Sequence, residues 1–425
     1  MIYRNATTQE LQTELTSLKT EFERYRSLGL KLDMSRGKPC TAQLNLSEKL
    51  LTIVSHNEEC FAEDGMDVRN YGGIDGIAEM KRLFAKVMNV SEDMMFVGGA
   101  SSLRMMYDAY ARNVLFGSCE GSQPWGKAPH RFLCPVPGYD RHFAISECLG
   151  AELIPIPMNE NGPDMDLVES LVKDDPSVKG IWCVPKYSNP TGITYSDETV
   201  RRLVSMPTAA PDFRIFWDNA YAIHDLYEEG DRLAEIFTLA REYGNEDRVY
   251  EFASFAKVTY CGGTVSALAT SARNRAFTKK LLSKQFICND KVNQLRHARF
   301  FGDYEGLMAH MKKHADILRP KFEAVIDAFE RELAPCGVGS WNKPRGGYFI
   351  SLDLPEGTAK RTHALCKELG VVLTPAGATF PYGKDPKDSN LRIAPSCPTP
   401  EELRLATEVL CLCAKIAACE KALGV

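Results

Sequence analysis

The chain has 425 residues, of which 44% are hydrophobic and 25% are charged, so it is long enough for two domains and has the composition of an ordinary globular protein. A formal net charge of -5 provides no broad basic surface and argues against a nucleic-acid partner. No apolar run approaches the roughly 18–20 residues that a membrane helix needs, and the start "MIYRNATTQE" lacks the basic-then-apolar pattern of a secretory signal.

The 14 cysteines are scattered along the chain, and none forms a CxxC pair. Near the end, Cys411, Cys413 and Cys419 fall along one expected helix without a second group of ligands. This pattern favours free, mostly buried thiols in a reducing compartment over disulfides or a metal centre. We therefore expect a cytoplasmic protein with no metal site.

The first expected element is a helix within residues 7–28. Apolar side chains recur there at alternating steps of four and three: Leu11, Leu15, Leu18, Phe22 and Tyr25. The spacing predicts one apolar stripe, which would pack against a neighbouring domain or subunit. Thr7 and Glu10 stand at the spacing of a capping box, which would begin the helix.

From about residue 50 to residue 270, short apolar runs alternate with helix-like segments. Six of these runs end directly in a loop: residues 94–99, 131–138, 151–157, 180–185, 213–218 and 249–254. Near-continuous apolar strands separated by helices predict an α/β fold with a mostly parallel sheet covered by helices on both faces. In such sheets, ligands bind at the carboxyl ends of the strands.

The C-terminal part has a different pattern. A long helical stretch over about 274–333 is followed by strand-like runs at 346–354, 370–377 and 390–396, with helices after the first and last. We expect a smaller α+β domain here, which the N-terminal segment joins in space. The predicted organisation is a small domain from residues 1–48 and 311–425, and a large domain from residues 49–310.

Polar segments follow the expected strands directly. In "VGGASS", Ala100, Ser101 and Ser102 stand between a strand and a helix, where free backbone N–H groups suit a phosphate. A plain turn in which a serine caps the helix fits equally well. In "PKYSNPTG", prolines and a glycine hold a rigid turn that would present Asn189 as a fixed donor, although a turn without a ligand is an open alternative.

Two further strands end at ionisable side chains. Asp218 follows "FRIFW", where a carboxylate is costly unless it is paired, and Tyr221 comes three residues later. An aspartate that caps the next helix is the alternative. Lys257 in "SFAK" is a candidate nucleophile, because desolvation lowers the pKa of a lysine, whereas an isolated lysine is more often solvated at the surface.

Taken together, "NPTG" (189–192), "DNAY" (218–221) and "SFAK" (254–257) resemble the signatures of the fold-type I pyridoxal-phosphate aminotransferases. The resemblance spans nearly the whole chain. Three further stretches are most similar to the aspartate aminotransferases of subgroup Ic: "RGKP" (36–39), "NYGGIDG" (70–76) and "DKVNQLRH" (290–297).

The resemblance implies a fold, a cofactor and a reaction. The fold is the pyridoxal-phosphate transferase fold type I, with a mostly parallel sheet of the seven-stranded type. The cofactor is pyridoxal 5'-phosphate. The expected reaction moves an amino group from an L-amino acid, with aspartate expected, to a 2-oxo acid, with 2-oxoglutarate expected.

The same resemblance implies the catalytic residues. Lys257 would join the cofactor aldehyde and later move the Cα proton of the substrate. Asp218 would pair with the pyridine nitrogen and keep it protonated, so that the ring can take up charge. Tyr221 and Asn189 would donate to the 3-oxygen of the ring, with Asn189 also near the substrate.

Further contacts follow from the resemblance. Tyr139 would stack on the cofactor ring, and His142 would stand behind the aspartate. The phosphate group would be held by a set of small side chains and backbone groups: Ala100, Ser101, Ser102 and Ser254. Tyr71 would reach the phosphate from a neighbouring subunit, which implies a homodimer with shared sites. Arg392 and the backbone of Gly37 would bind the substrate α-carboxylate.

The chain also departs from the family pattern. Many relatives carry an arginine against the phosphate eight residues after the lysine, but this chain has Val265 there. Arg104 and Lys291 are candidates to replace it, and neither is favoured by the sequence. The cation for a second substrate carboxylate is equally open, with five candidates: Lys38, Arg36, Lys291, Arg296 and Arg345.

Two other functions stay open at this point. A lyase or decarboxylase that uses the same cofactor would share Lys257 and Asp218. A cofactor-binding regulatory domain would need a basic DNA-binding module before the body, but only about 40 residues precede the body, and they form one expected helix.

Overall fold

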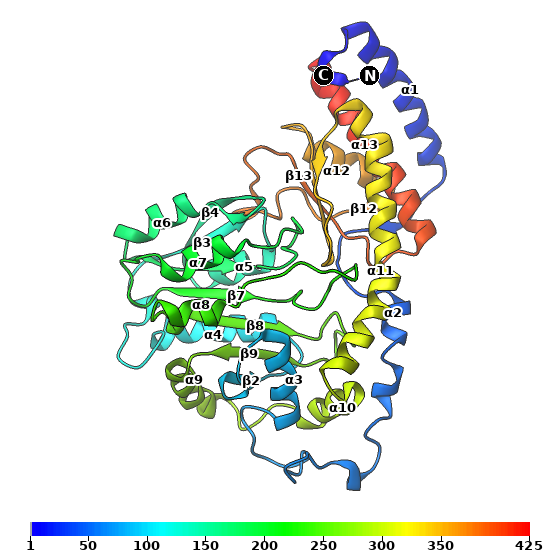
Figure 1. Ribbon diagram of the computed structural model, residues 1–425. Coiled ribbons are helices and arrows are strands. Elements are labelled where there is room, and N and C mark those ends of the chain that lie inside the picture. The colour runs from blue at the N-terminus through cyan, green and yellow to red at the C-terminus, as the bar shows by residue number, and fades with distance from the viewer. Residues whose placement is uncertain (1) are drawn as a thin grey trace.

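The computed structural model describes residues 2–425, and its largest feature is an eight-stranded sheet in the order β2-β9-β8-β7-β6-β3-β4-β5 (Figure 1). The strands from β8 to β4 run parallel, and β9 and the edge strand β5 run antiparallel to their neighbours. Seven strands have three residues or more: β2 (Met95–Val97), β3 (His130–Val136), β4 (Ala151–Asn159), β6 (Val178–Cys183), β7 (Arg214–Asp218), β8 (Val249–Ser254) and β9 (Ser266–Thr270). The short β5 (Gly162–Pro163) extends the edge. The predicted α/β class with a mostly parallel sheet is thus confirmed.

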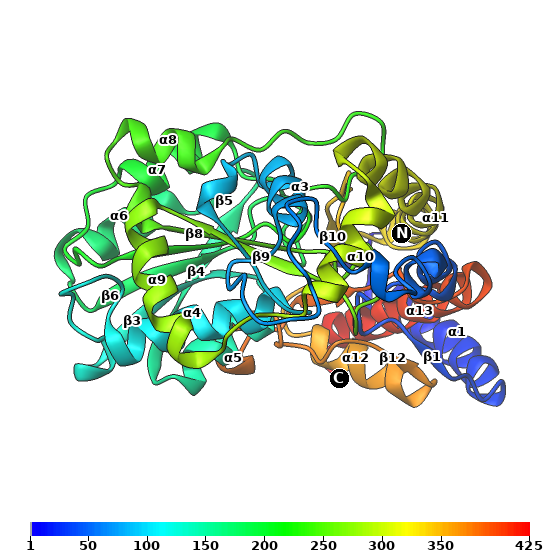
Figure 2. The same cartoon turned by 90° about the horizontal axis from the view of Figure 1, so that it is seen from below.

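Helices cover both faces of this sheet, and Figure 2 shows α4 and α5 on one side of the strands and α7 and α8 on the other. The first face forms one core with α4 (Ser102–Phe116), α5 (Asp140–Cys148) and α9 (Ala272–Gln285). The second face forms a separate core with α3 (Ala78–Met88), α6 (Met165–Asp174), α7 (Asp197–Ser205), α8 (Ile236–Glu242) and α10 (Lys291–Phe301). Burial of both faces explains why the strands read as nearly continuous apolar runs.

A second body is built from the two ends of the chain, at the top of Figure 1. Its helices are α1 (Thr8–Ser27), α12 (Ala359–Glu368) and α13 (Pro400–Leu423). Its strands form an antiparallel sheet of β10 (Ser340–Trp341), β11 (Ile350–Asp353) and β13 (Asn390–Ile393), and a parallel pair of β1 (Leu32–Asp33) and β12 (Val371–Val372). The apolar stripe of α1 is buried in this core, and the capping box of Thr7 and Glu10 is formed as predicted.

The predicted helical stretch over 274–333 is divided into three helices, α9, α10 and α11 (Tyr304–Glu332). Gly302, with a φ of 74°, ends α10 just before Asp303 caps α11. The start of α11 contributes Leu307 to the core of the large sheet, and from Leu318 onward the helix belongs to the core of the second body. The predicted boundary at residue 310 therefore lies inside a continuous helix, and the domain limits stay a prediction.

Several short helices complete the structure. They are α2 (Thr41–Asn45) and the 3-10 helices Tyr3–Asn5, Glu48–Leu51, Asn57–Glu59, Glu92–Met94, Trp125–Lys127, Glu246–Arg248, Ala334–Cys336 and Pro381–Gly383. Within residues 2–425, no helix has a long enough apolar stretch to cross a membrane. The same residues contain no group of three or more His, Cys, Asp or Glu side chains placed to hold a metal ion. All 14 cysteines are free, and eight of them are buried.

Candidate active site

A cavity of about 700 Å³ lies at the carboxyl ends of β6, β7 and β8, where residues of the sheet and of the second body meet. Ten of the twelve residues predicted from the sequence line it: Gly37, Ser101, Ser102, Tyr139, Asn189, Asp218, Tyr221, Ser254, Lys257 and Arg392. Ala100 precedes this lining in the chain without joining it, and the side chain of Tyr71 is 77% exposed outside the cavity. The folded chain thus gathers these ten residues from seven separate segments at one edge of the sheet.

Asp218 is the last residue of β7 and is almost completely buried. Its Oδ2 lies 3.0 Å from Nε2 of His142, whose ring stacks on Trp182 at 4.3 Å between centres. The other carboxylate oxygen, Oδ1, is buried and has no hydrogen-bond partner among the described residues. A buried acceptor without a donor is costly, so Asp218 is prepared to receive a hydrogen-bond donor from a ligand.

Lys257 follows β8 and places its Nζ 5.3 Å from the ring centre of Tyr221 and 5.7 Å from that of Tyr348. The hydroxyl of Tyr348 donates to the backbone carbonyl of Lys257 at 3.1 Å, which fixes the turn. Desolvation lowers the pKa of Lys257, although the negative charge of Asp218 opposes that shift. The amine is therefore easier to deprotonate than a solvated lysine.

Two tyrosines complete the inner wall. Burial raises the pKa of Tyr139 to about 12, with Asp218 adding to the effect, and its ring lies edge-on to His142 at 4.9 Å. Tyr221 is 3% exposed, and burial raises its pKa well above the usual value. Both phenols therefore keep their protons near neutral pH and act as hydrogen-bond donors.

The N-terminus of α4 faces the cavity. Ser101 caps this helix, because its side chain accepts a hydrogen bond from the backbone N–H of Arg104 at 3.3 Å, and Ser102 is the first helical residue. Ser254, at the end of β8, lines the same cavity. Free N–H groups at a helix start, together with hydroxyls, form a site that suits an anion.

Arg392, on β13, brings the second body into the site. Its Nη1 donates to Oδ1 of Asp140 at 2.9 Å and lies 3.4 Å from Oδ1 of Asn189, while the guanidinium lies over the ring of Phe349 at 4.9 Å. The same ring explains Gly37, because a Cβ at that position would lie 2.4 Å from Cζ of Phe349. Only glycine therefore allows the segment to pass over this aromatic side chain.

Three more cations line the mouth of the cavity: Arg36, Lys38 and Arg141. The first two were among the candidates from the sequence, but Arg141 was missed, although it lies between the two singled-out residues of "PGYDRH". Lys291 is engaged elsewhere, since its Nζ donates to the carbonyls of Asn70 and Gly72 at 2.6 and 2.8 Å.

The remaining candidate cations lie outside the cavity. Arg104 is 79% exposed at its side chain and pairs loosely with Asp108, and Arg345 donates to the carbonyl of Glu229. Arg296 does not line the cavity either. Val265 is buried in the core of the large sheet and does not line the cavity.

Comparisons with known proteins agree with this arrangement. The sequence matches the model of the family described as aspartate amino-transferase over residues 6–425. It is 48% identical over 397 residues to a putative aminotransferase of Mycolicibacterium smegmatis, with 93% of each chain covered. It is 47% identical over 404 residues to an aspartate aminotransferase of Corynebacterium glutamicum, with 95% of this chain and 93% of the relative covered. The crystal structure of an aspartate transaminase from Corynebacterium glutamicum superposes with a TM-score of 0.97 at 45% identity and covers 99% of both chains.

Proposed function

The chain belongs to the aspartate aminotransferase family and is an aminotransferase, and from this we propose that it uses pyridoxal 5'-phosphate to move the amino group of L-aspartate to 2-oxoglutarate. The observation that carries the proposal is the unpartnered, buried Oδ1 of Asp218 in the same cavity as the amine of Lys257. The first group suits a protonated ring nitrogen, and the second suits an aldehyde.

The residues present fit this cofactor at each of its functional groups. The pyridine nitrogen would meet Asp218, whose other oxygen is held by His142. The phosphate would meet the start of α4 and the hydroxyls of Ser101, Ser102 and Ser254, with helix N–H groups supplying part of the positive charge that the missing arginine would provide. When bound, the cofactor supplies an electron-accepting ring that stabilises negative charge at the substrate Cα.

The side chains then have distinct tasks. Lys257, with its lowered pKa, would take the proton from the substrate Cα and return it to the C4′ carbon of the cofactor. Asp218 would keep the pyridine nitrogen of the cofactor protonated, and its pairing with His142 fixes the orientation of the carboxylate. Tyr221, which keeps its proton, donates a hydrogen bond to an oxygen of the ligand.

Arg392 is our candidate for the substrate α-carboxylate. Asp140 accepts a hydrogen bond from the guanidinium at 2.9 Å and orients it, so an incoming carboxylate would meet an oriented donor. The second carboxylate of aspartate would meet the cations at the mouth, Arg36, Lys38 and Arg141. These three supply more positive charge than an α-carboxylate requires, which supports a dicarboxylic substrate.

We also propose a homodimer with shared active sites. Tyr71 is an exposed aromatic side chain on a loop, and Lys291 holds that loop by donating to the carbonyls on both sides of the tyrosine. A large aromatic residue displayed on an anchored loop suits insertion into a neighbouring subunit. The proposed division into a small domain of residues 1–48 and 311–425 and a large domain of 49–310 assigns Arg392 and Gly37 to the small domain.

One experiment separates the proposed reaction from the other functions. The purified protein, loaded with pyridoxal 5'-phosphate, is mixed with L-aspartate alone while the cofactor absorbance and the released 2-oxo acid are followed. An aminotransferase releases one 2-oxo acid per loaded subunit and stops, and 2-oxoglutarate then restores the original spectrum. Continuous product release without a second substrate would indicate a lyase or decarboxylase, and a spectral change without product would indicate a binding domain.

A further inference from the structure

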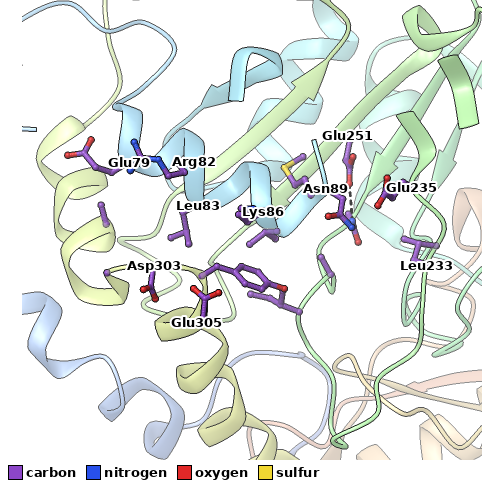
Figure 3. A pocket seen from close by; sticks show the side chains of 18 of the residues that line it. Glu79, Arg82, Leu83, Lys86, Asn89, Leu233, Glu235, Glu251, Asp303 and Glu305 are labelled. Carbon is purple, nitrogen blue, oxygen red and sulfur yellow. Dashed lines mark hydrogen bonds between the residues drawn. The ribbon is translucent and has the colours of Figure 1, made fainter. Parts of the chain in front are cut away.

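A second and larger cavity, of about 940 Å³, lies on the α3 and α10 side of the sheet (Figure 3). Its walls come from α3, α10, the first turn of α11 and the segment that precedes α8. None of the predicted site residues lines it. Volumes of this size accommodate small-molecule ligands in many proteins.

Glu251 and Asn219 form what we call the floor of this cavity, and this floor carries two buried acceptors without donors. Glu251 on β8 is 2% exposed, and its Oε1 accepts a hydrogen bond from Nδ2 of Asn219 at 2.9 Å. Oε2 of Glu251 and Oδ1 of Asn219 are buried and have no partner among the described residues. A third orphan acceptor, Oε2 of Glu79, belongs to the same lining. The floor therefore lacks hydrogen-bond donors.

Glu251 is also an ionisable residue in a buried strand whose neighbouring side chains are apolar. It stands between apolar residues of β8 and points to the same side of the sheet as Val249 and Ala253, which belong to the core of that side. Burial raises the pKa of Glu251 to about 8 because its carboxylate is poorly solvated there, so a cationic donor beside it would stabilise the ionised form. A buried acid that destabilises a core strand is expected where it serves a ligand.

The charged residues around the floor limit which class of ligand the cavity can bind. Figure 3 shows Glu251 beside Asn89 and Glu235 at one end of the cavity, with Glu79 at the other end and Lys86 between them. Arg232 also lines the cavity and directly precedes Leu233, which lies at the Glu251 end. Lys86 and Arg232 form no ion pair with any residue in the described part of the chain. The acidic side chains of Glu79 and Glu235 in the lining disfavour a simple anion, and these two cations disfavour a ligand with several ammonium groups.

We propose that this cavity binds a small α-amino acid as a zwitterion, with the ammonium group on Glu251 and Asn219 and the carboxylate on Lys86 and Arg232. An ammonium group offers three donors, and two of them match the unpartnered Oε2 of Glu251 and Oδ1 of Asn219. The lining also contains apolar side chains such as Leu83 and Leu233, which suit a short aliphatic side chain. The assignment does not depend on the proposed reaction.

The site lies next to the catalytic aspartate in the chain but on the other face of the sheet. Asn219 directly follows Asp218, and Glu251 directly precedes Phe252, which is the residue paired with Asp218 in the sheet. Successive side chains of a strand point to opposite faces, so one residue serves each cavity. A ligand bound to Glu251 and Asn219 would therefore lie next to the backbone that positions Asp218.

Binding can be measured with three matched probes on the holoenzyme by isothermal titration calorimetry. 2-Aminoisobutyrate carries both charges and has no Cα hydrogen, so it cannot complete an amino transfer. Isopropylamine lacks its carboxylate, and isobutyrate lacks its amino group. We expect 2-aminoisobutyrate to bind most tightly and Glu251→Gln to weaken it at least tenfold, with Glu228→Gln, at an exposed position outside the cavity, as the matched control.

A second variant separates the two ends of the ligand. Lys86→Met should weaken 2-aminoisobutyrate several-fold and leave isopropylamine unchanged, because only the first probe has a carboxylate. A crystal soaked with 2-aminoisobutyrate should show density on Glu251. Equal affinities of the wild type and Glu251→Gln, a dependence of isobutyrate on Glu251, or the absence of density there would each overturn the proposal. These outcomes leave the aspartate reaction untouched, so the two proposals fail independently.

Discussion

At the residue scale, two opposing influences act on the pKa of Lys257. Desolvation favours its neutral amine, and the carboxylate of Asp218 favours the ammonium form, with a net lowering of the pKa. We expect Lys257→Ala to reduce turnover by at least about 10²–10⁴-fold, the usual contribution of a positioned base, while the fold is kept. Steady-state rates and circular dichroism check this expectation, and near-normal turnover of the variant would contradict the role of Lys257.

Arg141 and Arg392 are expected to recognise different carboxylates. Arg392→Ala should raise the KM of both aspartate and alanine by about 10–100-fold, because a charge-assisted contact contributes roughly 1.5–3 kcal/mol. Arg141→Met should raise the KM of aspartate alone, since only aspartate has a second carboxylate. The matched control is Arg273→Met, which removes an exposed arginine outside the cavity. A parallel loss for alanine in Arg141→Met would assign that arginine to another task.

The raised pKa of Glu251 predicts the sign of the pH dependence of folding stability. Its pKa is about 8 in the folded chain and near the ordinary 4.5 when unfolded, so between these values the folded chain holds a proton that the unfolded chain releases. Stability is therefore lost as the pH rises from about 4.5 to 8, at a limiting slope on the order of 1 kcal/mol per pH unit.

Glu251→Gln cannot titrate, so it should escape this loss. Its melting temperature relative to the wild type should rise steadily between pH 5 and pH 8 and level off above. Thermal unfolding followed in a series of buffers measures the difference. A constant difference across the series would mean that Glu251 is ionised in the folded protein throughout.

At the scale of elements, the sequence predicted what depends on local pattern. The strands that end in the active-site residues and the apolar stripe of α1 follow from periodicity and are present. Strand β9 was not predicted, because its "SALAT" consists mainly of small and hydroxyl residues and has no apolar run. The breaks between α9, α10 and α11 were missed because they are short. Only residues 286–290 and 302–303 interrupt the helices, and helix-forming residues continue close to both breaks.

The site was predictable only where residues stand in contiguous motifs. Lys257 and Asp218 were found because they follow apolar strands, and Arg392 was found by resemblance. Arg141 enters the cavity through the orientation of α5, which no local pattern specifies. Asn219 directly follows Asp218 in the sequence, but its hydrogen bond with Glu251 could not be predicted. That contact depends on the pairing of β7 with β8, which brings the two residues together.

The loop after β6 positions Asn189, and a substitution at Gly192 tests how far contact with the second body supports that loop. Gly192 has a φ of 71°, and a Cβ there would lie 2.7 Å from Cβ of Pro344 in the second body. The carbonyl of the preceding Thr191 accepts a hydrogen bond from Asn342 at 2.9 Å, so the loop is held against that segment. We expect Gly192→Ala to cost about 1–3 kcal/mol of stability and to lower kcat by displacing Asn189.

The matched control for this change is Gly244→Ala. Gly244 has a similar φ of 67°, and no atom lies within 4 Å of its added Cβ, so it reports backbone strain alone. Urea unfolding and kcat should show a larger loss for Gly192→Ala on both measures. Equal losses would show that contact with Pro344 has no influence on the site.

At the scale of the whole molecule, shared sites can be tested by mixing inactive variants. In the proposed homodimer, Tyr71 serves the neighbouring site, whereas Lys257 serves its own. A heterodimer of Tyr71→Ala and Lys257→Ala subunits contains one site with both residues intact and one site with neither. Coexpressed and purified as the mixed species, it should regain up to about half of the normal activity. Activity no higher than the mean of the two parent variants would place Tyr71 outside the partner's site.

The single helix α11 has 29 residues, which at the usual rise corresponds to a rod about 43 Å long. Tyr304 and Glu305, in its first turn, form part of the wall of the larger cavity. Its later turns pack in the core that also contains Leu391 and Ile393 of β13, on either side of Arg392. The helix α11, with Pro320 inside it, thus connects the wall of the larger cavity to the core around Arg392, so a ligand in that cavity would contact the same continuous element that supports this arginine.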